Sequence, residues 1–228
     1  MIFVTADMHG DIERFKDKQL KKLKKTDTLI VLGDFGFIWN DDAKQKKDLK
    51  KIASMPFKTL FIDGLNENFE KLSQFPETEY CRARASEIVK DKIYYIHRGE
   101  IAEIEGKKLL CFGGCDCYDP DIVFSQNDPC KRDFENCDAN LQRQENRVDF
   151  ILTHMPGGKI NRFIDLNSNF SSEGMEYLDT LADKVQYTKW YFGCLHMDKY
   201  VSPKVQGVYT DVIALWEEKK KGLFGFKK

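Results

Sequence analysis

Five carboxylate and imidazole side chains each follow the carboxyl end of an apolar run in the sequence. They are Asp7, His9, Asp34, His154 and His196. Asp and His contribute little to apolar packing, whereas carboxylate oxygens and neutral imidazole nitrogens are common ligands of divalent metal ions. The chain has four histidines, and three of them occupy such positions. The pattern therefore predicts a metal site at the ends of several strands.

The spacing of these residues supports convergence on one edge of a sheet. Asp7 and His9 are two residues apart, and strand alternation places residues i and i+2 on the same side. Gly33 precedes Asp34 and allows a close backbone approach, so that this carboxylate can bridge two cations. A single histidine at a strand end is more often structural than a ligand. The prediction therefore rests on the five residues together.

The composition indicates one large domain or two small ones without a global electrostatic field. The chain has 228 residues, 42% of them hydrophobic, and a formal net charge of −1. This charge provides no general attraction for nucleic acid or for an anionic membrane. No apolar run approaches the ~20 residues of a membrane span, and the opening has no basic leader. We therefore expect a cytoplasmic protein without a membrane span.

The cysteines and the C-terminal tail carry weaker signals. The seven cysteines include no Cys-x-x-Cys pair, which favours reduced thiols in a cytoplasm. Cys115 and Cys117 flank Asp116 and could bind a metal, but small side chains in a tight turn are the favoured interpretation. Residues 216–228 form a basic tail with aromatic residues, which could contact a membrane or nucleic acid. A frayed terminus, or one that packs on a partner, is favoured.

The order of the expected elements indicates an α/β fold. Buried strands are predicted at residues 2–5, 28–32, 58–62, 107–112, 150–153 and 190–193. Helices are predicted at residues 44–53, 69–72 and 173–182. Alternating strands and helices thus come first, and a strand-rich half follows, closed by strands at residues 199–201 and 208–214.

Three further segments have specific expectations. Asp11 is expected to cap a helix whose apolar residues Phe15, Leu20 and Leu23 share one face. Residues 92–97 and 101–104 are expected to pair as neighbouring strands, joined through residues 98–100. Residues 116–147 are expected to form a long loop followed by a helix.

The order of these motifs resembles that of the calcineurin-like metallophosphoesterases. The family begins with Asp-x-His, which matches residues 7–9, and continues with Gly-Asp-x-Gly, which matches residues 33–36. The resemblance covers about residues 1–215. It implies a four-layer α-β-β-α sandwich, in which two mostly mixed β-sheets are flanked by helices. It also implies one or two divalent ions (manganese, zinc, iron or nickel), about 3.5–4 Å apart when both are present.

Two motifs depart from the family pattern. Residues 64–67 read Gly-Leu-Asn-Glu instead of Gly-Asn-His-Glu, and residues 193–196 read Gly-Cys-Leu-His instead of Gly-His-x-His. By resemblance, the first metal is bound by the complete set Asp7, His9, Asp34 and His196. Of the second set, Asp34 and His154 remain. Cys194 is either a thiolate ligand for a softer ion such as zinc or a small apolar filler.

Asn66 stands where the family has a histidine that assists the leaving group. Its amide donates a hydrogen bond but does not titrate near neutrality, and loss of a positioned acid costs roughly 10²–10⁴ in rate. An alignment shifted by one residue makes Asn66 the replacement for the family's metal-binding asparagine instead. In both alignments the acid is missing, and Asp34 and Asn66 are the candidate catalytic residues.

The resemblance implies hydrolysis of a phosphate mono- or diester by a metal-bound hydroxide, with an impaired second site. The substrate is then a phosphate-ester small molecule. The alternative is a catalytically weak or inactive relative that acts as a binding module. A nucleic-acid-processing enzyme is a third, weaker hypothesis, because the chain is nearly neutral. Four arginines are candidates for phosphate contacts, although a surface position is the default for each: Arg14, Arg98, Arg132 and Arg143.

Overall fold

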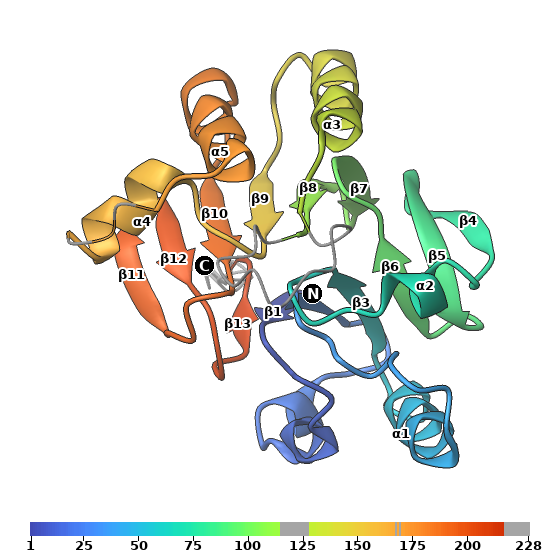
Figure 1. Ribbon diagram of the computed structural model, residues 1–228. Helices are drawn as coiled ribbons and strands as arrows, with labels where there is room; N and C mark the ends of the chain where they lie inside the picture. The colour runs from blue at the N-terminus through green and yellow to red at the C-terminus, as the bar shows by residue number, and fades with distance from the viewer. Residues whose placement is uncertain (115–127, 167, 169, 217–228) are drawn as a thin grey trace, which may run out of the picture.

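Two β-sheets packed face to face form the centre of the molecule (Figure 1). The computed structural model describes residues 1–114, 128–166, 168 and 170–216. Cys115 and Cys117, and all of the predicted basic tail except Trp216, lie outside the described residues.

The first sheet has seven strands in the order β13-β1-β2-β3-β6-β5-β4. Strands β1, β2, β3 and β6 are parallel, whereas β13, β5 and β4 each run antiparallel to the neighbour that attaches them. The bounds are β1 Ile2–Thr5, β2 Thr28–Leu32, β3 Lys58–Ile62, β4 Glu77–Tyr80, β5 Ala83–Val89, β6 Ile93–Ile96 and β13 Ile213–Ala214.

The second sheet has six strands in the order β11-β12-β10-β9-β8-β7. Its four inner strands, β12, β10, β9 and β8, are parallel, and the edge strands β11 and β7 are antiparallel. The bounds are β7 Glu100–Ile104, β8 Lys107–Phe112, β9 Phe150–Thr153, β10 Lys189–Phe192, β11 Lys199–Ser202 and β12 Val205–Gly207. Both sheets are therefore mixed, as expected.

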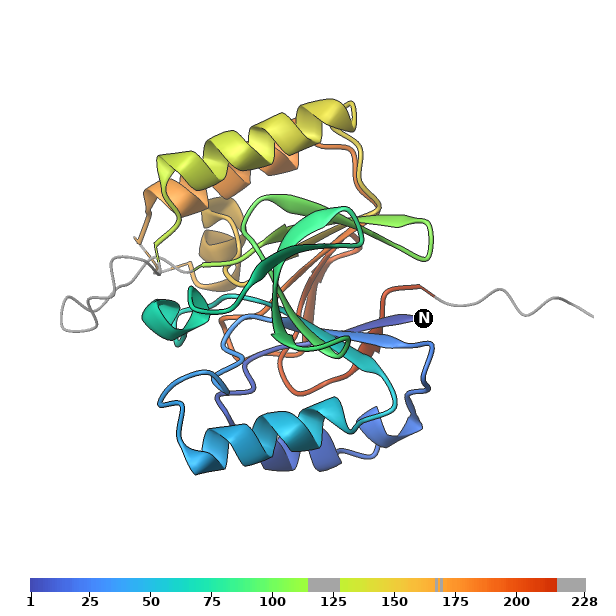
Figure 2. The same ribbon diagram turned by 90° about the vertical axis from the view of Figure 1, so that its right-hand side faces the viewer.

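Helices cover the outer face of each sheet, so that the molecule has four layers (Figure 2). Helix α1 (Ala43–Ala53) and two short 3₁₀ helices (Ile12–Lys16 and Leu20–Lys22) lie on the seven-stranded sheet. Helices α3 (Lys131–Arg143) and α5 (Glu173–Lys184) lie on the six-stranded sheet. The shorter helices are α2 Phe69–Leu72 and α4 Gly158–Ile164. In the described part of the chain, no helix has the length and apolar character that a bilayer crossing requires.

The period of two in the strands divides the apolar side chains between the layers. In β2, Ile30 and Leu32 pack between the two sheets, whereas Leu29 and Val31 pack under the outer helices. Every residue of β2 is buried, which is why its sequence reads as a continuous apolar run rather than an alternating one.

The expected pairing of residues 92–97 with 101–104 is wrong. Strand β6 pairs with β3 and β5 in the first sheet, and β7 pairs with β8 in the second. The chain crosses from one sheet to the other at residues 97–99. Gly99 has φ +76°, and a Cβ there would lie 2.8 Å from the Cys137 Cβ. Only a residue without a side chain fits this crossing.

Three other expectations need correction. Asp11 caps a 3₁₀ helix through the backbone N–H of Glu13 rather than an α-helix, and the chain turns at Asp17 before the second 3₁₀ helix. The single strand expected at 208–214 is absent, and β12 and β13 flank a turn at that place. Strands β4 and β5 and helix α4 were not predicted. Strand β4 consists of exposed polar residues and Tyr80, so no apolar pattern marks it.

Candidate metal centre

The candidate centre lies where the carboxyl ends of parallel strands from both sheets meet. Asp7 follows β1, Asp34 follows β2, His154 follows β9 and His196 follows β10. Strands β1 and β2 are parallel neighbours in one sheet, and β9 and β10 are parallel neighbours in the other. Each sheet therefore contributes two adjacent strand ends.

Two groups of donor atoms converge there, each within 4.8 Å of one another. The first group is Asp7, His9 and His196, and the second is Asp7, Asp34 and His154. Asp7 belongs to both. The side chains of His9 and His196 are 37% and 51% exposed, whereas Asp7, Asp34 and His154 are buried. The centre thus has two buried carboxylates and a buried imidazole on its inner side, and two exposed imidazoles on its outer side.

Both carboxylates span the centre. Asp7 Oδ2 lies 3.6 Å from His196 Nε2, and Asp7 Oδ1 lies 3.6 Å from His154 Nδ1. Asp34 Oδ2 lies 3.7 Å from His9 Nδ1, and Asp34 Oδ1 lies 3.7 Å from His154 Nε2. The resemblance assigns the bridging role to Asp34 alone, but the structure places Asp7 between two imidazoles as well.

The turn at residues 64–67, whose sequence differs from the family motif, contacts the centre through Asn66. Its backbone N–H donates to Asp34 Oδ1 at 2.7 Å, and its side-chain amide donates to Asp34 Oδ2 at 2.8 Å. Leu65 instead packs against the apolar core under α3 and α5. A Cβ on Gly64 would lie 2.3 Å from Asp34 Oδ1, so this turn can approach Asp34 only with glycine there.

Asp7 meets the requirement for a cation ligand. Among the described residues, both of its side-chain oxygens are buried without a hydrogen-bond donor. Burial raises the pKa of Asp7 to about 6, and the facing His154 and His196 limit that rise. A buried carboxylate whose oxygens accept no hydrogen bond is unfavourable by several kcal/mol. A divalent cation would remove this penalty.

The exposed imidazoles fit the same ion. His9 Nε2 and His196 Nε2 are 3.2 Å apart, which is compatible with two nitrogens bound to one cation at about 2.1 Å each. Burial lowers the pKa of His9, which favours the neutral ring that metal binding requires. Carboxylate oxygen with imidazole nitrogen is a donor set suited to manganese, zinc, iron or nickel.

Burial and nearby negative charge act in opposite directions on the pKa of His154. Burial alone would lower its pKa, but the Cys194 thiol and the carboxylates of Asp34 and Asp7 raise it well above the ordinary value. Its Nδ1 lies 2.9 Å from the Leu32 carbonyl oxygen. Cys194 contacts His154, although it is not a member of either donor group. The raised pKa favours the protonated ring, so a cation in the second group competes with a proton for His154.

Backbone strain is concentrated at this centre. Five of its residues have side chains and a left-handed φ between +46° and +61°: Asp7, His9, Asp34, Cys194 and His196. Such conformations cost of order 1–3 kcal/mol each and cluster at functional sites. Gly33 has φ +87°, and a Cβ there would lie 2.1 Å from His154 Nδ1. The strand ends are thus turned sharply to aim their side chains inward.

Supporting residues were harder to recognise from sequence. Glu67 is buried, and its Oε1 accepts the backbone N–H of Phe35 at 2.8 Å, which holds the turn after Asp34. Arg98 is buried and Arg14 is half-buried, and both bind partners inside the fold. Arg132 and Arg143 are exposed. From the sequence, Arg14 was a candidate only for a phosphate contact, and no pattern marked its internal partners.

Comparison with known proteins does not assign the chain to a family. No protein-family model matches it, and no curated protein sequence matches it. The crystal structure of a protein of unknown function from Aquifex aeolicus is similar over 82% of this chain and 87% of that chain, with 18% sequence identity and a TM-score of 0.35. At that score the likeness carries no argument about fold or function.

Proposed function

We propose that the chain is a metal-dependent phosphoesterase of the calcineurin-like metallophosphoesterase class. The observation that carries the proposal is the buried carboxylate of Asp7, whose oxygens face His154 and His196 and have no hydrogen-bond donor in the part of the chain that the structure describes. Four further ligand-type residues converge on it in the order that the family's motifs follow. The four layers of the fold are compatible with that class.

Each residue has a role in the proposal. Asp7, His9 and His196 hold one cation, and the family resemblance makes Asp34 the fourth ligand of that cation. Asp34 and His154 hold a second, weaker cation together with Asp7, and Cys194 lies beside it. When bound, the cations supply Lewis acidity at the phosphoryl oxygens and a nucleophilic water at neutral pH.

Asn66 determines which esters are suitable. Its amide is fixed against Asp34 and has no proton to give to a leaving alcohol near neutrality. An ester whose leaving alcohol has a low pKa needs little assistance, whereas an alkyl ester needs a great deal. We therefore propose a small-molecule phosphate ester with a good leaving group as the substrate.

We also propose a cytoplasmic location. The cysteines that the structure describes form no disulfide, and reduced thiols are usual in that compartment.

The alternative is a weak or inactive relative that binds a phosphate-bearing ligand. The turn at residues 64–67 favours it, because Leu65 is directed into the core and Asn66 does not titrate. The same centre would then hold a cation and an anionic ligand without hydrolysis.

A hydrolysis assay with added manganese, zinc, iron or nickel distinguishes the two. We expect turnover of 4-nitrophenyl phosphate or bis(4-nitrophenyl) phosphate that chelation removes and metal restores. Methyl esters should react more slowly than the nitrophenyl esters. Departure of methanol would need the missing acid, which typically contributes roughly 10²–10⁴ in rate. Metal-loaded protein that hydrolyses neither nitrophenyl ester would support the binding module. Rapid turnover of alkyl esters would show that Asn66 imposes no restriction.

A further inference from the structure

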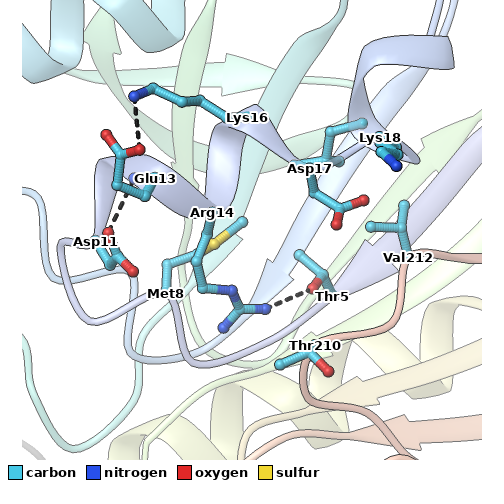
Figure 3. A pocket seen from close by; sticks show the side chains of 11 residues that line it. Thr5, Met8, Asp11, Glu13, Arg14, Lys16, Asp17, Lys18, Thr210 and Val212 are labelled. Atoms are coloured by element: carbon cyan, nitrogen blue, oxygen red, sulfur yellow. Dashed lines mark hydrogen bonds and ion pairs between the residues drawn. The ribbon is translucent and has the colours of Figure 1, made fainter.

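Arg14 lies behind the backbone of Asp7 and fastens it to a distant loop. Its Nη1 donates to the carbonyl oxygens of Ala6 and Asp7, at 2.8 and 2.6 Å. Its Nη2 donates to Thr5 Oγ1 at 3.2 Å and to the carbonyl oxygen of Tyr209 at 2.7 Å. Figure 3 shows the guanidinium reaching toward Thr5. One side chain thus joins the end of β1 to the segment after β12.

Tyr209 continues this connection to the metal centre. Its ring stacks on the His196 imidazole, with centroids 4.7 Å apart and planes inclined by 21°. The Arg14 Cζ lies 5.4 Å from the centroid of the same tyrosine ring, within the range of a cation–π contact. The backbone N–H of Tyr209 donates to Asp198 Oδ1 at 2.7 Å. Tyr209 is therefore held between the guanidinium and the imidazole.

These contacts coincide with strained backbone. Asp7 and His196 have φ of +51° and +46°, a conformation that L residues keep only where surrounding contacts impose it. Arg14 binds the carbonyl oxygens on both sides of the Asp7 backbone nitrogen, those of Ala6 and Asp7. It is connected to His196 through the ring of Tyr209. A planar guanidinium can bind several acceptors at fixed angles, whereas a lysine ammonium acts as a point charge.

The surroundings of Arg14 allow it to be changed without leaving a closed void. Arg14 lines a cavity of 490 Å³ together with Asp11, Asp17 and Thr210 (Figure 3). Water can enter this space when the side chain is shortened, so a variant should fold. Lys16 lies in the same 3₁₀ helix, is exposed, and pairs with Glu13. It provides a matched control.

We propose that Arg14 is a positioning residue of the Asp7, His9 and His196 group, which holds the Asp7 backbone and, through Tyr209, the plane of the His196 ring. The inference rests on the metal centre of the proposed function but not on phosphoester hydrolysis. Residues that orient metal ligands typically change metal affinity 10–100-fold when they are removed.

The test compares wild type with Arg14→Ala, Arg14→Lys, Tyr209→Leu, Arg14→Ala combined with Tyr209→Leu, and Lys16→Ala. Calorimetric titration with Mn²⁺ gives the dissociation constant, and NMR of the metal-free protein gives the ring resonances of His196, assigned with His196→Gln. We expect Arg14→Ala to bind Mn²⁺ about 10–100-fold more weakly, Arg14→Lys to be intermediate, and Lys16→Ala to match wild type. The combined variant should weaken Mn²⁺ binding by less than the product of the two single effects, because Arg14 and Tyr209 share their connection to His196.

The NMR readout separates positioning from simple stabilisation. Arg14→Ala and Tyr209→Leu should both shift the His196 resonances before any metal is added. A folded Arg14→Ala protein with unchanged His196 resonances and unchanged Mn²⁺ affinity would overturn the proposal, even if its melting temperature fell. Wild-type protein that binds Mn²⁺ but hydrolyses no ester would contradict the proposed reaction and leave the positioning result intact. Wild-type protein that binds no Mn²⁺ would contradict both.

Discussion

Glu67 is a buried carboxyl group that supports the centre from behind. Its Oε1 accepts backbone N–H groups of the turn after Asp34, and its Oε2 has no donor among the described residues. Burial raises the pKa of Glu67 well above the ordinary value of 4.5, and the nearby Asp34 raises it further. A raised pKa in the folded state gives a stability contribution that is complete below the unfolded pKa and is lost as pH rises toward the folded pKa.

Glu67→Gln should therefore change the pH dependence of stability. The variant has no group to titrate, so its stability relative to wild type should increase above about pH 4.5, by up to about 1.4 kcal/mol per pH unit. Urea unfolding of metal-free protein at several pH values measures this difference. Glu13→Gln, at an exposed position, is the control. Parallel curves for wild type and Glu67→Gln would mean that Glu67 is ionised in the folded protein.

Under the proposed function, Cys194 is either a ligand of the second cation or a small filler beside it. The thiol contacts His154, and a thiolate ligand favours softer ions. We expect Co²⁺ bound at the second group to show a sulfur-to-cobalt charge-transfer band that Cys194→Ser abolishes and Cys81→Ser retains. A wild-type cobalt complex without such a band would identify Cys194 as a small filler rather than a ligand.

Residue types could be recognised from the sequence, but their geometry could not. Strand alternation was the argument for placing Asp7 and His9 on one side, yet β1 ends at Thr5 and both residues have left-handed φ. They converge because the chain turns. The sharing of Asp7 between two groups follows from that turn, and no periodicity in the sequence encodes it.

At the scale of elements, Arg98 fastens the crossing between the two sheets. It is buried, and its Nε donates to Asp63 Oδ2 at 2.8 Å, while its Nη1 donates to Asp133 Oδ2 at 3.1 Å. Asp63 follows β3 and Asp133 lies in α3. Tyr95 also donates to Asp63, at 2.9 Å. One side chain therefore links the crossing to the end of β3 in the first sheet and to α3 on the second.

Arg98→Ala should destabilise the protein strongly. Removing one partner of a buried ion pair leaves an uncompensated charge on Asp63, and this typically costs about 3–5 kcal/mol in the free energy of unfolding. Arg132→Ala, at an exposed position, should change it by no more than about 0.5 kcal/mol. Denaturant unfolding of both variants measures the difference. A cost below about 1 kcal/mol for Arg98→Ala would show that water or a neighbouring cation replaces the guanidinium.

The same crossing shows why some elements were predictable and others were not. Strands β1, β2 and β3 are mostly apolar and mostly buried on both faces, and their predicted bounds agree with the structure. The separation of β6 from β7 depends on Gly99 and on the ion pair of Arg98, which are tertiary contacts. Local pattern alone favoured a hairpin there.

For the molecule as a whole, the centre depends on two sheets whose carboxyl-end edges face each other. The sequence indicates that the polar residues of the centre follow apolar strands, which predicts convergence at one edge of a sheet. Nothing in its periodicity brings β1 and β2 together with β9 and β10. Only the resemblance to metallophosphoesterases implied two packed sheets, and that packing brings the two groups of donor atoms together.

The most direct test is to titrate metal-stripped protein with Mn²⁺ and to measure bound metal and the initial rate of bis(4-nitrophenyl) phosphate hydrolysis in the same samples. We predict that the rate rises as the first cation binds, that folded Asp7→Ala shows neither stoichiometric metal nor turnover, and that Glu13→Gln matches wild type. Folded Asp7→Ala that retains stoichiometric metal, or a fully loaded wild-type protein without turnover, would contradict the account.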